Sequence, residues 1–170
     1  NIISGRRETQ YTAQQLLDEL QPSHVILGPG PGWPSDSRLT MEFAQLSLSG
    51  DAPPLLGICL GHQAIGVSSG LSLVPSPIGP VHGTPVKCLH KGEALFEGLD
   101  DVSMTRYNSL THLTADVSGE SNLIVDATDD TKSLVLGFRA KGRPVFGVQF
   151  HPESVGSQFG GHILSKFLEY

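Results

Sequence analysis

Disulfide patterns, long apolar runs and an excess of basic charge are all missing from this 170-residue chain, and each absence excludes a class of protein. Two cysteines, Cys59 and Cys88, provide no disulfide framework, so we expect a reducing compartment, either the cytoplasm or an organelle such as a plastid. No apolar run approaches the ~20 residues of a membrane-spanning helix, so we expect no membrane partner. The chain starts at Asn1 without a secretory signal pattern. Because 17 acidic residues outnumber 11 basic ones, nucleic acid is also not an expected ligand.

The sequence is equally poor in signatures of bound metals and nucleotides. The glycine-rich stretch 28–32 has neither the Gly-Lys-Ser/Thr of a phosphate-binding loop nor the spacing of a dinucleotide fold. His24 and His112 show no metal-ligand spacing, and we expect no metal ion and no cofactor. No internal repeat or low-complexity segment is present, and the length suits a single domain, residues 1–170, with its own core.

Helical and strand patterns alternate along the chain. Helices are expected over 12–20, 38–48, 60–67 and 158–168. Strands are expected over 24–28 and 55–58, in several short pieces of 71–128 that include 121–127, and in a hairpin of 132–138 with 143–150. A capping box between Thr12 and Gln15 opens the first helix. This alternation indicates an α/β fold with an open, mainly parallel central sheet and helices on both faces.

The most informative segment is Pro-Pro-Leu-Leu-Gly-Ile-Cys-Leu-Gly-His-Gln, residues 53–63. A short apolar strand runs into a helix here, Cys59 stands at the junction, and Gly57 and Gly61 on either side permit a tight turn. This is the layout of a nucleophile elbow, with sulfur in place of a serine hydroxyl. The positive end of the helix dipole would lower the pKa of the thiol and raise its thiolate fraction. The alternative is that Cys59 is only a small buried apolar residue at a strand end.

A base and an orienting acceptor for such a thiol follow the last predicted strand. His151 comes directly after Phe150 in a turn enforced by Pro152, and Glu153 lies two residues further on. Parallel strands place their C-terminal ends at one edge of an α/β sheet, so His151 and Glu153 would face Cys59 there. A thiol, a base and an orienting carboxylate are the parts of an amidase-like site.

Donors for an oxyanion are expected from the strand and loop His-Val-Ile-Leu-Gly-Pro-Gly-Pro-Gly-Trp-Pro, residues 24–34. Its glycines let backbone N–H groups approach a ligand closely, although a Gly-Pro repeat alone is more often only a turn. The N–H of Leu60, directly after the cysteine, would be the second donor. Trp33 on this loop is either a lid over the substrate or a contact for a partner protein, with plain packing as a third option.

Together these segments resemble the class I, triad-type glutamine amidotransferase domain. Gly-Ile-Cys-Leu-Gly-His-Gln (57–63) and Gly-Val-Gln-Phe-His-Pro-Glu-Ser (147–154) match the two main signatures of that family, and Gly-Pro-Gly-Pro-Gly (28–32) matches its oxyanion loop. Within the family, residues 80–83 and 106–110 make the chain most similar to the glutaminase components of aminodeoxychorismate synthase and anthranilate synthase.

The resemblance implies that the chain hydrolyses L-glutamine and delivers ammonia to a chorismate-aminating synthase, which is either a separate subunit or a fused domain. Cys59 would attack the amide and form a γ-glutamyl thioester that water then hydrolyses, with His151 as base and then acid, and Glu153 orienting it. As the product, 4-amino-4-deoxychorismate of the folate pathway is slightly preferred over anthranilate of the tryptophan pathway. The residues that the resemblance places around glutamine and its oxyanion are Gly30, Pro31, Gly32, Leu60, Gln63, Ser109 and Leu110.

The chain also departs from the family pattern in two ways. Asn108 stands where the usual pattern has histidine. Family members usually begin with a strand and a helix ahead of Asn1, so we expect an N-terminally incomplete piece of a longer chain, with an exposed apolar edge on its sheet. Two alternatives stay open: the glutaminase of another synthetase, such as GMP synthetase or carbamoyl-phosphate synthetase, and a catalytically inactive module that only contacts a partner. The presence of the cysteine, histidine and glutamate favours an active enzyme.

Overall fold

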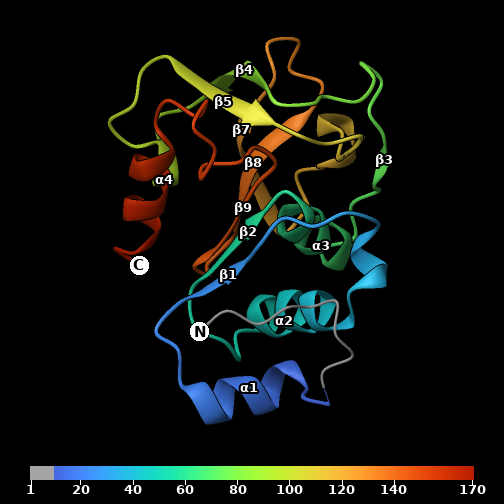
Figure 1. Cartoon of the computed structure of the whole chain (residues 1–170), viewed down its shortest axis with the longest axis vertical. Helices are drawn as coiled ribbons and strands as arrows, with labels where there is room; N and C mark the ends of the chain where they lie inside the picture. The colour runs from blue at the N-terminus through green and yellow to red at the C-terminus, as the bar shows by residue number, and fades with distance from the viewer. Residues whose placement is uncertain (1–9) are drawn as a thin grey trace.

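A seven-stranded sheet runs through the molecule in the computed structural model, which describes residues 10–170 (Figure 1). Its spatial order is β1-β2-β9-β8-β7-β4-β5. The strands are β1 Val25–Leu27, β2 Leu55–Ile58, β4 Thr84–His90, β5 Val102–Arg106, β7 Leu123–Thr128, β8 Val135–Ala140 and β9 Val145–Val148. Two further strands, β3 Val74–Pro75 and β6 Leu110–Thr111, pair with each other in a separate sheet.

The sheet is mixed, whereas the sequence indicated a mainly parallel one. The strands β1, β2 and β9 are parallel to one another, and the pairs from β9 through β8, β7 and β4 to β5 are antiparallel. The reason is the length of the connections. A parallel crossover needs a dozen or more residues, but only residues 141–144 separate β8 from β9, which therefore form the expected hairpin. The α/β class is confirmed, and the parallel part is the part that carries the elbow.

Among residues 10–170, four α-helices cover the sheet, close to their expected positions: α1 Ala13–Leu20, α2 Arg38–Ser49, α3 Leu60–Ser68 and α4 Gly160–Phe167. The predicted capping box is confirmed, since the Thr12 hydroxyl accepts the N–H of Gln15 at 3.1 Å and the Gln15 carboxamide accepts the N–H of Thr12 at 2.8 Å. No helix among residues 10–170 combines the length and apolarity that crossing a membrane requires.

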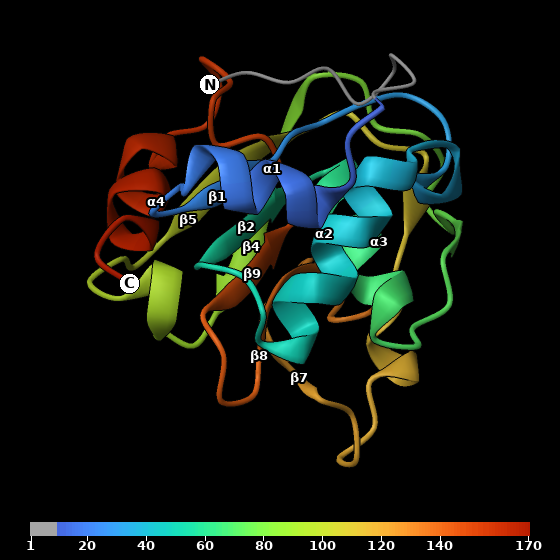
Figure 2. The same ribbon diagram turned by 90° about the horizontal axis from the view of Figure 1, so that it is seen from below.

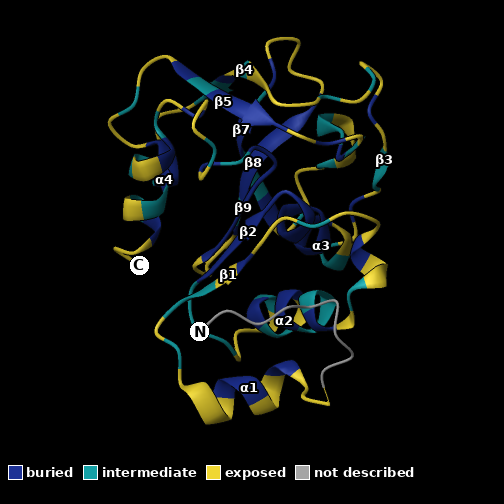
Figure 3. Cartoon of the chain, in the orientation of Figure 1, coloured by how far each residue is buried: buried dark blue, intermediate teal, exposed yellow. Residues whose placement is uncertain are grey.

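The core is divided by the sheet into two halves, and the alternation of side chains along β2 shows how. Leu55 packs with the apolar faces of α1, α2 and α3, while Leu56 packs with Ile163 and Phe167 of α4. Figures 1 and 2 show α1, α2 and α3 grouped on one side of the sheet. Figure 3 shows the central strands and α3 in the dark blue of buried residues. Helices on both faces are therefore confirmed.

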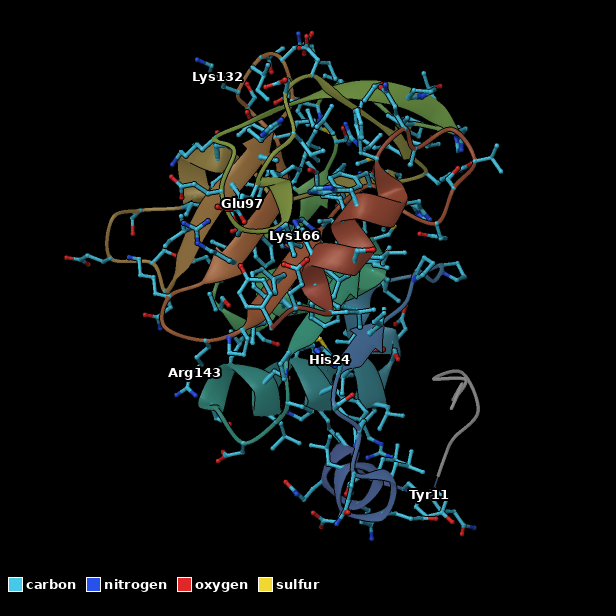
Figure 4. All side chains as sticks on the ribbon, turned by 90° about the vertical axis from the view of Figure 1, so that its left-hand side faces the viewer. Tyr11, His24, Glu97, Lys132, Arg143 and Lys166 are labelled. Carbon is cyan, nitrogen blue, oxygen red and sulfur yellow. The ribbon has the colours of Figure 1, made fainter. Side chains whose placement is uncertain are left out.

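The C-terminal end of α4 contacts the segment before β1 and the loop after the short helix at 94–96 (Figure 4). The ring of His24, just before β1, lies edge-on to Phe167 with 5.3 Å between ring centroids. Lys166 Nζ lies 3.0 Å and 3.1 Å from the carboxylates of Glu169 and Glu97, exposed pairs that each contribute little. His24 thus has a packing role here.

Strand β1 forms one edge of the sheet and exposes apolar surface, as the sequence analysis expected. Half of Ile26 is exposed. A hollow of about 900 Å³ lies beside β1 and is lined by apolar side chains of α1 and α2, including Leu17 and Phe43. The same hollow continues along the Gly-Pro loop to Leu60, so this edge of the sheet leads directly to the elbow.

Candidate functional site

Cys59 occupies a strained turn between β2 and α3, as a nucleophile elbow requires. Its backbone has φ 52° and ψ −99°, a conformation that side-chain-bearing residues rarely adopt and that costs about 1–3 kcal/mol. A Cβ on Gly57 would stand 2.5 Å from the backbone of Gly61, and one on Gly61 would stand 2.4 Å from the carbonyl oxygen of Leu27. Both glycines are needed because α3 begins in contact with the ends of β1 and β2.

The parallel pair β2 and β9 brings the thiol and the proposed base to the same edge of the sheet. Ile58 pairs with Val148, and the N–H of Cys59 donates to the carbonyl of Val148 at 2.9 Å. The next turn carries His151, whose Nδ1 lies 2.7 Å from Glu153 Oε1. This contact holds the imidazole in one orientation and fixes the position of its proton.

The other nitrogen of this imidazole is available. His151 Nε2 is buried and has no hydrogen-bond partner among residues 10–170. The backbone on both sides is anchored, because the N–H of His151 donates to the carbonyl of Thr105 at 2.8 Å and the hydroxyl of Ser157 donates to the carbonyl of His151. The ring of Tyr107 lies edge-on at 4.9 Å. The imidazole is thus fixed, with one nitrogen left for a thiol or a substrate.

The acidity of Cys59 differs from the expectation. Burial raises the pKa of the Cys59 thiol to about 11, and the Glu153 carboxylate adds to the rise. The Leu60 N–H, the Arg106 guanidinium and the Gln149 side chain each lower it, but together they do not outweigh burial. The start of the helix therefore does lower the pKa of the thiol, as expected. Desolvation raises it by more, because the side chain is only 7% exposed. In this state the thiol is protonated at neutral pH.

A measurable consequence is the pH dependence of thiol alkylation in the isolated chain. The thiolate is the reactive form, so below a pH of about 11 the rate for Cys59 should rise about tenfold per pH unit. Iodoacetamide labelling across the range from neutral to alkaline pH, followed by mass spectrometry of the Cys59 peptide, tests this. A rate that levels off near neutral pH would contradict the raised pKa.

The Gly-Pro loop lies against the elbow, as predicted. A Cβ on Gly30 would stand 2.9 Å from Leu60 Cδ2, so the loop and the start of α3 are in close contact. Gly32 has φ +87°, and the N–H of Trp33 donates to the carboxylate of Asp36 at 2.8 Å. Pro31 and Gly32 are exposed, and Trp33 is 47% exposed at the loop tip. The loop thus lies beside the first residue of α3, directly after Cys59.

The other three residues predicted to surround glutamine, which are Gln63, Ser109 and Leu110, form hydrogen bonds within the protein. Gln63 is buried, and its Nε2 donates to the carbonyl of Leu110 at 3.1 Å and to Gln149 Oε1 at 3.2 Å. The Leu110 carbonyl also accepts a bond from Asn108, and the carbonyl of Ser109 accepts the N–H of Ser76 at 2.8 Å. Of these three, Ser109 alone is exposed.

Polar residues that the sequence analysis gave no role surround this site. Gln149 and Arg106 are fully buried, and Asn108 is 5% exposed. The signal in the sequence is a polar residue inside an apolar run, as in Val148-Gln149-Phe150. Such a signal marks burial, but it does not say which groups meet.

The other histidines near the site form no metal site among the described residues, and His62 packs in the core. His62 is fully buried and stacks on Phe138 with 4.5 Å between ring centroids. Burial, and after it the neighbouring His112 and Arg106, hold the pKa of His62 well below its usual value, so this imidazole is neutral. Within residues 10–170 no three potential metal ligands are grouped to hold an ion. His82 is exposed on the 76–83 loop.

Comparison with known proteins agrees with this geometry. A family model described as glutamine amidotransferase class-I matches residues 6–170. The chain is 39% identical over 158 residues to anthranilate synthase component 2 of Thermus thermophilus, covering 90% of this chain and 73% of that protein. It is 34% identical over 170 residues to aminodeoxychorismate synthase component 2 of Serratia marcescens, covering 98% and 85%. The crystal structure of a glutamine amidotransferase from Thermotoga maritima superposes with a TM-score of 0.66 at 21% identity, covering 88% of this chain and 62% of that one.

Proposed function

This chain belongs to the class-I glutamine amidotransferase family, and on that premise we propose that it hydrolyses L-glutamine and delivers the ammonia to a chorismate-aminating synthase. The observation that carries the proposal is the strained Cys59 turn at the same sheet edge as the His151–Glu153 pair. A turn that costs free energy without stabilising the fold is typical of a functional residue.

The proposed chemistry proceeds in two halves. Cys59 gives its proton to His151 Nε2, and the sulfur attacks the amide carbon of glutamine. The oxyanion that forms is held by the N–H of Leu60 and by N–H groups of the loop at Gly30 and Gly32. His151 then protonates the leaving nitrogen, ammonia departs, and water attacks the thioester to release glutamate and restore the thiol. Glu153 orients His151 and stabilises its charged form.

Around the substrate, we propose that Pro31 shapes the loop and that Ser109 and Leu110 offer their N–H groups to glutamine. Gln63 has its carboxamide turned to Leu110 and Gln149, so it would act by supporting this wall of the site. The resemblance implied that Gln63 contacts the amino-acid end of glutamine directly. We propose instead that it acts through Leu110 and Gln149.

The preferred synthase product is 4-amino-4-deoxychorismate, on the resemblance described above. Anthranilate is the second candidate, and it is supported by the similarity to an anthranilate synthase component, as the first is by the similarity to an aminodeoxychorismate synthase component. Mixing the chain with a chorismate-binding component of each type, and identifying the aminated product made from glutamine, distinguishes the two.

We predict that the isolated chain hydrolyses glutamine slowly and that its synthase accelerates it. The Cys59 thiol is protonated and His151 Nε2 lacks a partner within the described residues, so the isolated chain is not in its most reactive state. The loop 28–34 lies beside Leu60, and we propose that it is the element that the synthase realigns. One misaimed oxyanion donor costs ~10²–10³ in kcat, and we expect activation of about that size. Glutaminase rates at saturating glutamine, with and without the synthase, measure it, and equal rates would refute it.

Trp33 and the exposed loop around His82 are the proposed contacts with the synthase. In the same assay Trp33→Ala should reduce the activation while leaving the slow rate of the isolated chain unchanged. The matched control is Leu168→Ala, which removes a similarly exposed apolar side chain from the end of α4. Parent-like activation of Trp33→Ala would move the interface elsewhere.

A further inference from the structure

Arg106, at the end of β5, is a buried cation that lacks an ion-pair partner within residues 10–170. Its side chain is fully shielded from solvent, and it is the largest fully buried side chain in the described part of the chain. Its Nε donates to Asn108 Oδ1 at 3.0 Å, while its two terminal nitrogens find no hydrogen-bond partner among the described residues. Burying a guanidinium without an ion-pair partner is unfavourable. The ionisable groups that act on it are the Cys88 thiol, the Asp129 carboxylate and the Cys59 thiol.

Asn108 connects this cation to the glutamine side of the site. While its Oδ1 accepts from Arg106, its Nδ2 donates to the carbonyl of Leu110 at 2.8 Å. The same carbonyl accepts from Gln63, whose Nε2 also reaches Gln149 Oε1. One continuous chain of hydrogen bonds thus links the end of β5, helix α3 and the residue that follows β9.

The far end of this chain lies beside the nucleophile. Gln63 stands one turn along α3 from Cys59 and donates its N–H to the Cys59 carbonyl at 3.0 Å. Gln149 is two residues before His151, and its Nε2 has no partner among the described residues. Both Arg106 and Gln149 act to lower the pKa of Cys59 against its burial. The buried donors of this region therefore lack an acceptor, which a sulfur anion would supply.

We propose that Arg106 and Asn108 are positioning residues for the glutaminase reaction: Asn108 fixes the Leu110 carbonyl and with it Gln63 and Gln149, and Arg106 provides a buried positive charge next to Thr105, whose carbonyl holds the His151 turn. The inference rests on the proposed function, because the anion forms when the Cys59 proton passes to His151. Neither residue touches the reacting atoms, and both act through the thiol.

The substitution Asn108→Asp separates this role from a structural one. Aspartate keeps an acceptor for Arg106 and gives the guanidinium a carboxylate partner, which offsets the repulsion between the new carboxylate and the Leu110 carbonyl, so the fold should be kept. It loses the N–H that holds the Leu110 carbonyl, and it neutralises the positive charge near Cys59. A purely structural role predicts an unharmed enzyme, whereas the positioning role predicts a stable protein with a less reactive thiol.

The experiment measures the melting temperature, the pH dependence of Cys59 alkylation, and kcat and KM for glutamine with the activating synthase. For Asn108→Asp we expect a folded protein with a melting temperature near that of the parent, alkylation slowed about tenfold at mildly alkaline pH and kcat lowered by about tenfold or more, as a one-unit rise in thiol pKa implies. The matched control is Asn122→Asp, the same change at an exposed position before β7, which should match the parent. A folded Asn108→Asp protein with parent alkylation and kinetics would overturn the inference.

If Asn108→Asp does not fold, Arg106→Gln decides, since it keeps a donor toward Asn108 and removes the charge. Slower Cys59 alkylation in this variant supports the role of the charge, and a parent-like profile overturns it. Failure of the proposed function is distinguishable, because it would leave the parent without glutaminase activity beside any chorismate-binding synthase, whatever the alkylation of its variants shows.

Discussion

Cys59→Ala is expected to abolish glutamine hydrolysis in the presence of the synthase while leaving the fold and partner binding nearly intact. The substitution removes one sulfur atom from a small side chain and leaves the elbow backbone as it is. The cost in the free energy of unfolding should be about 1 kcal/mol, the centre of the usual range for point substitutions. The sulfur is also the proposed site of the covalent intermediate, so no slower route through the same half-reaction remains.

The matched control is Cys88→Ala, which removes the only other thiol in the sequence, buried on β4. Glutamate release is measured for both variants, together with the aminated product formed from added ammonia. Free ammonia bypasses the thiol, so ammonia-dependent synthesis should survive in Cys59→Ala. Release of glutamate by Cys59→Ala at the parent rate would show that the nucleophile is another residue.

The parts of the site that the sequence predicted correctly are local. The elbow depends on a strand, two glycines and a helix within residues 55–68, so its pattern is complete in one short segment. The contact of His151 with Glu153 joins residues two positions apart in a turn set by Pro152. The Thr12 capping box likewise joins residues within one helical turn. In each case the residues that decide the geometry are neighbours in the chain.

The parts that the sequence did not predict depend on residues far apart. The β8–β9 hairpin was predicted, but the antiparallel pairing of β7, β4 and β5 was not, because the pattern within a single strand does not say which strand it pairs with. The raised pKa of Cys59 follows from the layers that bury it, so a correct local argument about the helix terminus gave the opposite direction. Arg106 is likewise surrounded by distant parts of the chain: it pairs with Thr84 of β4, and the carbonyl of the preceding Thr105 accepts the N–H of His151.

His151→Ala should have the second-largest effect, and a larger one than Glu153→Ala. The proposed base moves a proton in both halves of the reaction, and general acid–base transfer typically contributes ~10²–10⁴-fold to kcat. Glu153 only orients and stabilises the imidazole, and its side chain is 46% exposed, so water screens its charge. His162→Ala on α4 is the matched control for loss of an imidazole, and it should retain parent activity.

The variant Glu153→Gln separates the two ways in which Glu153 can support His151, by orienting its ring and by stabilising its positive charge. Glutamine keeps an oxygen that accepts from His151 Nδ1 but carries no charge. If Glu153 acts mainly by orienting His151, Glu153→Gln should retain most of the parent kcat, and its kcat should be higher than that of Glu153→Ala. If Glu153 acts mainly by stabilising the charged imidazole, the two variants should have similar kcat values. The measurement is kcat for glutamine with the synthase bound, at a pH where the parent is fully active. A greater loss for Glu153→Ala than for His151→Ala would reverse the roles, because an orienting group cannot contribute more than the base that it orients.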